Sequence, residues 1–189
     1  MSQAEQPVSI GAPIIAHKPS ISPSTPANLG SPPFGGVGGG FKMTDKQTLL
    51  DYRYLRMARV WAENSYCKRR QVGALVVKNK MIISDGYNGT PSGFENICED
   101  EGGQTKPYVL HAEANAITKL ARSGNNSDGS TLYVTASPCI ECAKLIIQAG
   151  IKRVVYAEKY RLTEGIDLLK RANIEVKYLN PEDHESEQE

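Results

Sequence analysis

Two short motifs in this chain contain side chains that bind metals, and the first also has a glutamate two residues after its histidine. The first is His-Ala-Glu, which begins at His111, and the second is Pro-Cys-Ile-Glu-Cys, which contains Cys139 and Cys142. A catalytic zinc ion needs three nitrogen or sulfur ligands, a fourth position for water and a nearby base. His111, Cys139 and Cys142 match the ligands and Glu113 matches the base. The two motifs therefore predict a hydrolytic zinc site.

The spacing within each motif fits the start of a helix. Cys139 and Cys142 are three residues apart, so on a helix their sulfurs point to the same side. Pro138 before them is typical of a helix start, and the positive end of a helix favours thiolates. On a regular helix Glu113 points roughly 200° away from His111, so Glu113 is not expected to be a ligand. It is expected to take a proton from water at the metal and deliver it to a substrate.

A closed structural zinc site is the alternative to a catalytic one. It needs a fourth ligand, which Cys67 or Cys98 would supply. A closed site gives no reason for Glu113, and the short cysteine spacing of such sites usually occurs in two pairs. The catalytic interpretation is therefore preferred.

Length, charge and cysteine count narrow the class of protein. The 189 residues suffice for one domain with a core plus a tail, and the net charge of +1 gives no general attraction to nucleic acid or membrane. We find no run of about 18 apolar residues that would span a membrane, and the first six residues do not resemble a secretory signal. Four cysteines, two of them in the metal motif, favour a reducing compartment. We therefore expect a cytoplasmic protein.

The chain divides by composition into three parts. Residues 1–42 hold seven of the eleven prolines and seven of the seventeen glycines, and we predict a disordered tail there. Residues 43–181 are predicted to form the catalytic domain. The acidic residues 182–189 are predicted to be frayed.

Apolar spacing and turn residues predict four helices and five strands in this domain. The first helix has apolar residues at helical spacing and Thr44 as its N-cap. Helices are predicted at 45–63, 112–122, 139–149 and 163–172, and strands at 72–77, 81–84, 131–135, 153–157 and 175–179. Residues 86–107 are predicted to form a loop. The alternating order favours an α/β fold with helices on both faces of a central sheet and both metal motifs at helix starts, where ligand sites gather.

Residues 45–180, approximately, resemble the cytidine/deoxycytidylate deaminase superfamily, and most closely its deoxycytidylate (dCMP) deaminases. The two zinc motifs are specific to the superfamily only. Three further stretches contribute to the match, and the second and third of them narrow it to dCMP deaminases. They are Gln-Val-Gly-Ala at 71–74, Gly-Tyr-Asn-Gly-Thr-Pro-Ser-Gly at 86–93 and Glu-Cys-Ala-Lys at 141–144.

The resemblance implies a three-layer α/β/α fold of the cytidine deaminase type with a five-stranded mixed sheet. It implies Zn²⁺ on His111, Cys139 and Cys142, with Glu113 as the proton shuttle. The reaction would be hydrolysis of dCMP to dUMP and ammonia, which feeds thymidylate synthesis.

The resemblance also implies substrate contacts, an assembly and a form of regulation. Asn88 would contact the sugar, and Tyr160 would line the nucleotide pocket. Members of the family are commonly hexamers that dCTP with Mg²⁺ activates and dTTP inhibits. The Tyr-Asn-Gly segment that contains Asn88 is linked to that regulation in the family.

The residues alone leave alternatives for these contacts. Asn88 is followed by glycine, the commonest pair in tight turns, so a plain turn is about equally supported. Tyr160 equally fits an ordinary half-buried aromatic residue. The basic run Lys68-Arg69-Arg70, and also Lys106, are candidates for the substrate phosphate, although most basic runs form solvated surfaces.

Cys67 and Cys98 raise the question of a second zinc site, as in some dCMP deaminases. Val109 and Leu110 stand just before His111, where a further ligand would help. We therefore expect these two cysteines to be free, buried thiols.

Other classes of function stay open at this stage. A deaminase of tRNA or single-stranded DNA would need a basic groove and stacking aromatics, which the balanced charge and the 7% of aromatic residues disfavour. Deaminases of other cytosine or purine compounds share the zinc motifs. A zinc-stabilised interaction module is the third class, and it would not need Glu113.

Overall fold

The computed structural model describes residues 46–180, which form four helices and one five-stranded sheet. The helices are α1 (Lys46–Ala62), α2 (Ala112–Leu120), α3 (Ile140–Gln148) and α4 (Glu164–Arg171). The strands are β1 (Gly73–Lys78), β2 (Met81–Tyr87), β3 (Thr131–Ala136), β4 (Arg153–Glu158) and β5 (Glu175–Tyr178). The predicted order of elements is confirmed. The predicted tail, the Thr44 N-cap and the acidic end lie outside the described residues.

The sheet is mixed, with the strand order β2-β1-β3-β4-β5. Strand β1 pairs antiparallel with β2 and β3, whereas β3, β4 and β5 are parallel. Asn79 and Lys80, which connect β1 to β2, both have positive φ angles, as a tight hairpin between twisted strands requires. Parallel neighbours need a crossover connection, and α3 and α4 supply the two crossovers.

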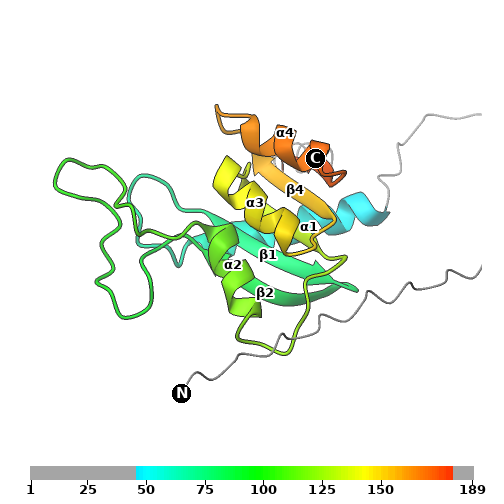
Figure 1. Cartoon of the computed structure of the whole chain (residues 1–189), viewed down its shortest axis with the longest axis horizontal. Coiled ribbons are helices and arrows are strands. Elements are labelled where there is room, and N and C mark those ends of the chain that lie inside the picture. The colour runs from blue at the N-terminus through cyan, green and yellow to red at the C-terminus, as the bar shows by residue number, and fades with distance from the viewer. Residues whose placement is uncertain (1–45, 181–189) are drawn as a thin grey trace, which may run out of the picture. The chain divides into compact units, whose positions relative to one another are not determined.

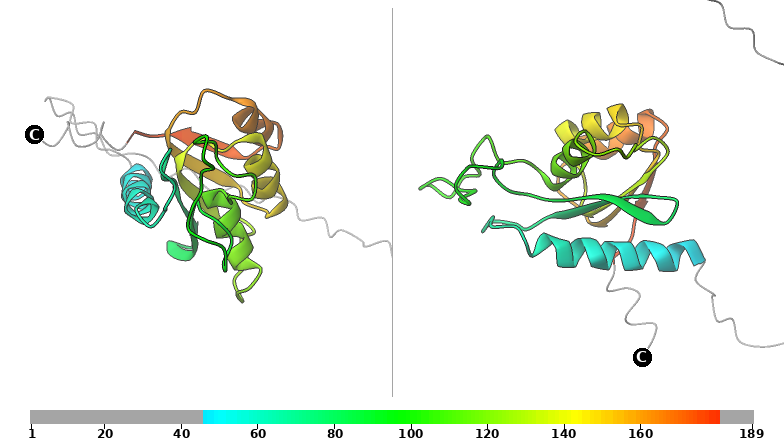
Figure 2. Two further views of the ribbon diagram at one scale, coloured as in Figure 1. Left: turned by 90° about the vertical axis from the view of Figure 1, so that its left-hand side faces the viewer. Right: turned by 90° about the horizontal axis from the view of Figure 1, so that it is seen from below.

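Helices cover both faces of the sheet, so the predicted three-layer fold is confirmed. Helix α1 alone packs on one face, against Leu75 and Val77 of β1, and α2, α3 and α4 pack on the other, against Ala74 and Val76 (Figures 1 and 2). Successive side chains of a strand point to opposite faces, so each strand contributes to both cores. No helix among residues 46–180 is long and apolar enough to cross a membrane.

Two glycines allow the starts of α2 and α3 to be held by close backbone contacts. A Cβ atom at Gly86 of β2 would overlap the carbonyl oxygen of Ala112 and lie 2.6 Å from the backbone nitrogen of Ala116. A Cβ atom at Gly165 of α4 would overlap the carbonyl oxygen of Pro138, just before α3. Backbone contacts of this kind leave no room for a side chain, so the positions of both helix starts are tightly defined.

A buried ion pair attaches α1 to strand β4. Asp51 of α1 is fully buried, and both of its carboxylate oxygens accept hydrogen bonds of 2.7 Å from the guanidinium of Arg153 on β4. The hydroxyl of Tyr133 and the side-chain amide of Gln47 also donate to Asp51, and Lys177 lies 3.3 Å away. Burial raises the pKa of Asp51, but these hydrogen bonds outweigh it and bring the pKa below its usual value of 3.8.

Replacing Asp51 by asparagine is expected to lower the free energy of unfolding at pH 7 by about 3 kcal/mol, because the substitution leaves the charge of Arg153 with only exposed Glu175 as its partner. A carboxyl group with a lowered pKa stabilises the fold above its unfolded pKa and loses this effect as the pH falls. The difference in the free energy of unfolding between the wild-type and Asp51→Asn proteins should therefore shrink below about pH 4. Urea denaturation from pH 7 to pH 3 measures it, and a difference that does not vary with pH would contradict this assignment.

Candidate active site

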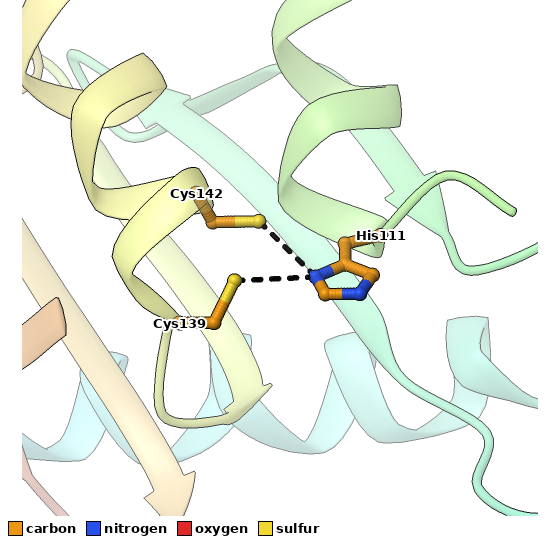
Figure 3. A group of neighbouring side chains, drawn as sticks. All are labelled: His111, Cys139 and Cys142. Atoms are coloured by element: carbon orange, nitrogen blue, oxygen red, sulfur yellow. Dashed lines mark hydrogen bonds between the residues drawn. The ribbon is translucent and has the colours of Figure 1, made fainter. Parts of the chain in front are cut away.

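His111, Cys139 and Cys142 meet at the starts of two neighbouring helices. The Nδ1 atom of His111 lies 3.5 Å from the sulfur of Cys139 and 3.4 Å from the sulfur of Cys142 (Figure 3). A tetrahedral zinc ion with ordinary bond lengths would separate a nitrogen ligand from a sulfur ligand by about 3.6 Å. The three residues therefore fit zinc in both atom type and spacing.

Both half-sites use the residue that caps a helix. His111 is the N-cap of α2 and Cys139 the N-cap of α3, each with extended backbone angles and without a side-chain capping bond. Their side chains are therefore directed away from the helix ends and toward each other (Figure 3). Cys142 follows in the first turn of α3, as the spacing of the cysteines predicts. The positive ends of both helices point at the site, which favours thiolate ligands.

Each member of the group formed by the two cysteines and the histidine shifts the pKa of another. The thiol of Cys142 donates to Cys139, and this bond, together with the one to His111, lowers the pKa of Cys139 to about 3. The same bond and burial raise the pKa of Cys142. The hydrogen bond with Cys139 also raises the pKa of His111. The site therefore already stabilises one thiolate, which is the form that binds a metal.

Glu113 lies in the first turn of α2 with only 4% of its surface exposed. Burial is the largest influence on its carboxyl group and raises its pKa, while its own backbone and His111 oppose the shift. The group that could hold a metal consists of His111, Cys139 and Cys142, as the helical spacing predicts. A buried carboxyl group with a raised pKa beside that group is suited to accept and return a proton.

The expectation of free thiols at Cys67 and Cys98 is wrong. Their sulfurs are bonded to each other, with the Cα atoms 5.1 Å apart, across 31 residues of sequence. This disulfide joins the loop between α1 and β1 to the long loop before α2. Neither sulfur is available as a metal ligand in this state, so it supplies neither a fourth ligand for a closed zinc site nor a second zinc site. The number of cysteines in the sequence favoured a reducing compartment for the protein. The disulfide removes that argument.

A pocket of about 510 Å³ opens beside the metal-binding group, within the usual size range for small-molecule sites. It brings together the residues that the sequence singled out from distant parts of the chain. The lining includes His111, Cys139, Glu113, Asn88, Tyr160, Arg69 and Arg70. Among the described residues, Lys68 and Lys106 are not part of this lining, although they were candidates for the phosphate.

Asn88 does not form the plain turn that its following glycine suggests. The chain continues past it, and Gly89 forms a backbone bridge with Leu110. The side-chain oxygen of Asn88 accepts a 2.7 Å hydrogen bond from the backbone of Val72, and its nitrogen donates to the carbonyl of Arg70. Asn88 therefore fixes the segment before β1 while it lines the pocket, and one of its amide hydrogens has no acceptor within residues 46–180.

Tyr160 lies on the pocket wall after β4 and is 39% exposed. Its backbone N–H donates to the hydroxyl of Ser137 at 2.8 Å, and the guanidinium of Arg70 lies 5.7 Å from the centre of its ring. Sequence reasoning gave no role to Ser137, Thr105 or Glu99, all of which line the pocket. Ser137 directly precedes the Pro-Cys motif. No motif marks Thr105 or Glu99, because only the folding of separate loops brings them to the pocket.

A second pocket, of about 430 Å³, lies on the other side of the disulfide. Cys67 lines the first pocket and Cys98 the second. The second pocket is formed by Tyr87 at the end of β2 and by the loop that follows, including Gly89 and the exposed Phe94, together with the exposed Tyr66. The disulfide therefore contributes one cysteine to the lining of each pocket.

Comparison with known proteins places this geometry in a family. Residues 49–158 match the model of the cytidine and deoxycytidylate deaminase zinc-binding region, which spans more than half of the chain. This segment contains every residue of the metal-binding group.

Relatives are similar along most of the described chain. The deoxycytidylate deaminase of Enterobacteria phage T4 is 36% identical over 65% of this chain and 86% of its own, and that of Homo sapiens is 39% identical over 57% and 64%. The crystal structure of a dCMP deaminase from cyanophage S-TIM5, in complex with dCMP and dUMP, is 48% identical with a TM-score of 0.68. It covers 72% of this chain and 99% of its own.

Removal of zinc is expected to lower the melting temperature, because a metal that binds only the folded state adds to its stability. Zinc at a hundred times its dissociation constant contributes about 3 kcal/mol. The Cys142→Ser protein should bind much less zinc and should not respond to chelator. Elemental analysis and thermal unfolding with and without chelator measure both effects, and full zinc content in the variant would exclude Cys142 as a ligand.

Proposed function

The chain belongs to the cytidine and deoxycytidylate deaminase family, and we propose that it hydrolyses dCMP to dUMP and ammonia, which feeds thymidylate synthesis. The observation that carries the proposal is the group of His111, Cys139 and Cys142 beside buried Glu113, at the wall of a nucleotide-sized pocket. The similarity to the S-TIM5 enzyme, whose crystal contains dCMP and dUMP, supports this substrate. Neither a polynucleotide deaminase nor an interaction module is favoured by an observation of this kind.

In this proposal His111, Cys139 and Cys142 hold the zinc ion. When bound, zinc lowers the pKa of a coordinated water molecule and so supplies a nucleophile near neutral pH. We propose residues 43–181 as the catalytic domain that holds this site. The cytoplasmic location of the protein stays a prediction.

Glu113 moves two protons in the proposed reaction. As the water oxygen adds to C4 of cytosine, the Glu113 carboxylate accepts a proton from the water and passes it to N3. It then takes the second proton of the former water and delivers it to the amino group, so that the C4–N bond breaks and ammonia leaves. The ring keeps the proton on N3 and a carbonyl at C4, which is the base of dUMP.

Asn88 and Tyr160 are proposed to position the nucleotide. The amide hydrogen of Asn88 that its backbone contacts leave available is a donor for an oxygen of the sugar. The ring of Tyr160 forms part of the pocket wall; Ser137 holds its backbone N–H, and the guanidinium of Arg70 lies over the ring. Both side chains line the same pocket as Glu113.

The Glu113→Gln protein is expected to lose dCMP turnover by roughly 100- to 10,000-fold, because glutamine has nearly the same shape but cannot carry a proton. It should keep its zinc, because Glu113 is not one of the proposed ligands. The loss of the cytosine absorbance band measures turnover, and elemental analysis measures zinc. A variant that retained the wild-type rate would reject Glu113 as the proton shuttle.

We also propose that the second pocket binds the regulators known for the family, dCTP with Mg²⁺ as activator and dTTP as inhibitor, in a hexamer. Tyr87 and Gly89 of the loop linked to regulation line this pocket, and Tyr66 and Phe94 offer aromatic surfaces for a base.

Addition of dCTP and Mg²⁺ is expected to raise the apparent affinity for dCMP, within the range of roughly 5- to 150-fold that is typical of coupled sites. Addition of dTTP should lower it. Saturation curves for dCMP with and without each effector measure the coupling, and sedimentation equilibrium measures the assembly. Curves that superimpose at every effector concentration would reject this regulation.

A further inference from the structure

The long loop before α2, residues 90–109, is attached to the fold by very little apolar packing. Its ends meet where Gly89 and Leu110 exchange backbone hydrogen bonds of 3.0 and 2.8 Å, and between them the loop projects beyond the sheet (Figure 1). The structure describes all of the loop, and Cys98 is its only buried residue, with 1% of its surface exposed. Neither hydrophobic core of the described residues includes a residue of the loop. A segment with so few buried contacts opens easily unless something else holds it.

The links from the long loop to the rest of the fold all reach one short segment before β1. In the described part of the chain, Glu99 accepts backbone N–H groups of this segment, and Arg69 donates a 3.3 Å hydrogen bond to Thr105. The disulfide joins Cys98 to Cys67 in the same segment. Water can replace hydrogen bonds that are exposed, but it cannot replace a covalent bond. The disulfide is therefore the strongest attachment of the loop.

The long loop supplies walls to both pockets but no ligand to the metal-binding group. Glu99 and Thr105 belong to the lining of the first pocket, beside the metal-binding group, and residues 90–98 supply most of the lining of the second pocket. The proposed zinc ligands lie at the starts of α2 and α3, which backbone contacts at Gly86 and Gly165 hold in place. A change in the attachment of the loop would therefore affect the pockets more than the metal-binding group.

We infer that the disulfide of Cys67 and Cys98 is a redox switch of substrate affinity. In the oxidised form it holds the long loop against the segment before β1, and both pockets have their walls. In the reduced form the loop lacks its covalent anchor and must be ordered again when a nucleotide binds, which lowers the affinity. The switch acts on binding and leaves the metal-binding group intact. Its readout with dCMP rests on the proposed function.

A small dithiol is the reductant, because Cys67 is 5% exposed and lines the open first pocket. One thiolate of the dithiol attacks the sulfur of Cys67, so that the bond to Cys98 breaks and Cys98 leaves as a thiolate that takes up a proton. The second thiolate of the reductant then attacks the mixed disulfide and releases Cys67 as the second thiol. The reductant leaves as a cyclic disulfide, so two electrons and two protons have passed to the protein. A small disulfide reverses the exchange and restores the bond.

The experiment compares the wild type with the double variant Cys67→Ser, Cys98→Ser, both full length and zinc-loaded, with and without dithiothreitol in a zinc buffer. Reduction of the wild type is expected to raise KM for dCMP about tenfold, with kcat changed by less than about twofold, as when the loop is ordered about one tenth of the time. Oxidised glutathione should restore the original KM. The double variant should resemble the reduced wild type and should not respond to dithiothreitol. It keeps Cys139 and Cys142, so it controls for effects of the reductant on the zinc ligands.

Hydrogen exchange gives a readout that needs no turnover. The backbone N–H groups of Asp100 and Lys106 are hydrogen-bonded within the long loop, and their exchange should become about tenfold faster or more on reduction. The amides of α2 and α3 should exchange at the same rate in both forms, which separates release of the loop from general destabilisation. Equal exchange of the loop amides in the two forms would overturn the inference, and so would faster exchange without a change in KM.

Two further results separate the switch from the proposed function. If the oxidised wild type did not deaminate dCMP, the proposed function would fail, and binding of dUMP measured by calorimetry would then test the switch. Weaker dUMP binding after reduction would support it, and unchanged binding would reject it. A wild-type protein whose Cys67 and Cys98 stayed free thiols in oxidised glutathione, by mapping of linked peptides, would also overturn the inference.

Discussion

Three ligand atoms from the starts of two helices must lie as close together as the ligands of a single zinc ion, and the rest of the structure depends on this requirement. His111 and Cys139 occupy helix N-caps, so a small shift of either helix start would separate them. Helix α2 packs on β1 and β2, helix α3 packs against α2 and α4, and glycines at 86 and 165 allow the backbone contacts that hold the two helix starts. The side chains of the site are therefore placed by the packing of backbone against backbone, with little adjustment left to the side chains themselves.

The substrate side of the pocket is organised in a different way from the metal side. It is built from the loop before β1 and the long loop before α2, which lack regular secondary structure and cannot place side chains by helix or strand geometry. Three specific links replace that geometry, namely the disulfide, the Glu99 carboxylate and the Asn88 amide. Each link fixes backbone near Arg69 or Arg70, so these arginines are held in place although they belong to loops.

The sequence predicts well what depends on local spacing. Apolar spacing and turn residues predicted the elements and their order. The spacing of Cys139 and Cys142 predicted that both sulfurs lie on the same side of α3. It fails where distant segments decide the outcome. The Asp51–Arg153 pair, the bonded pair of Cys67 and Cys98, and the extended chain after Asn88 all depend on contacts that no local pattern records. The basic run was similarly ambiguous, because only the fold shows that Arg70 pairs with Glu158 whereas Arg69 donates a hydrogen bond to Thr105.

The contact between Gly165 and Pro138 affects the order in which the protein matures during synthesis. All three proposed zinc ligands precede α4 in the chain, but the segment that carries Cys139 lacks part of its supporting surface until Gly165 has also emerged from the ribosome. A nascent chain that ends between α3 and α4 would possess a complete set of ligands without the packing that defines their spacing. We therefore expect capture of the metal in its final geometry to follow translation of α4.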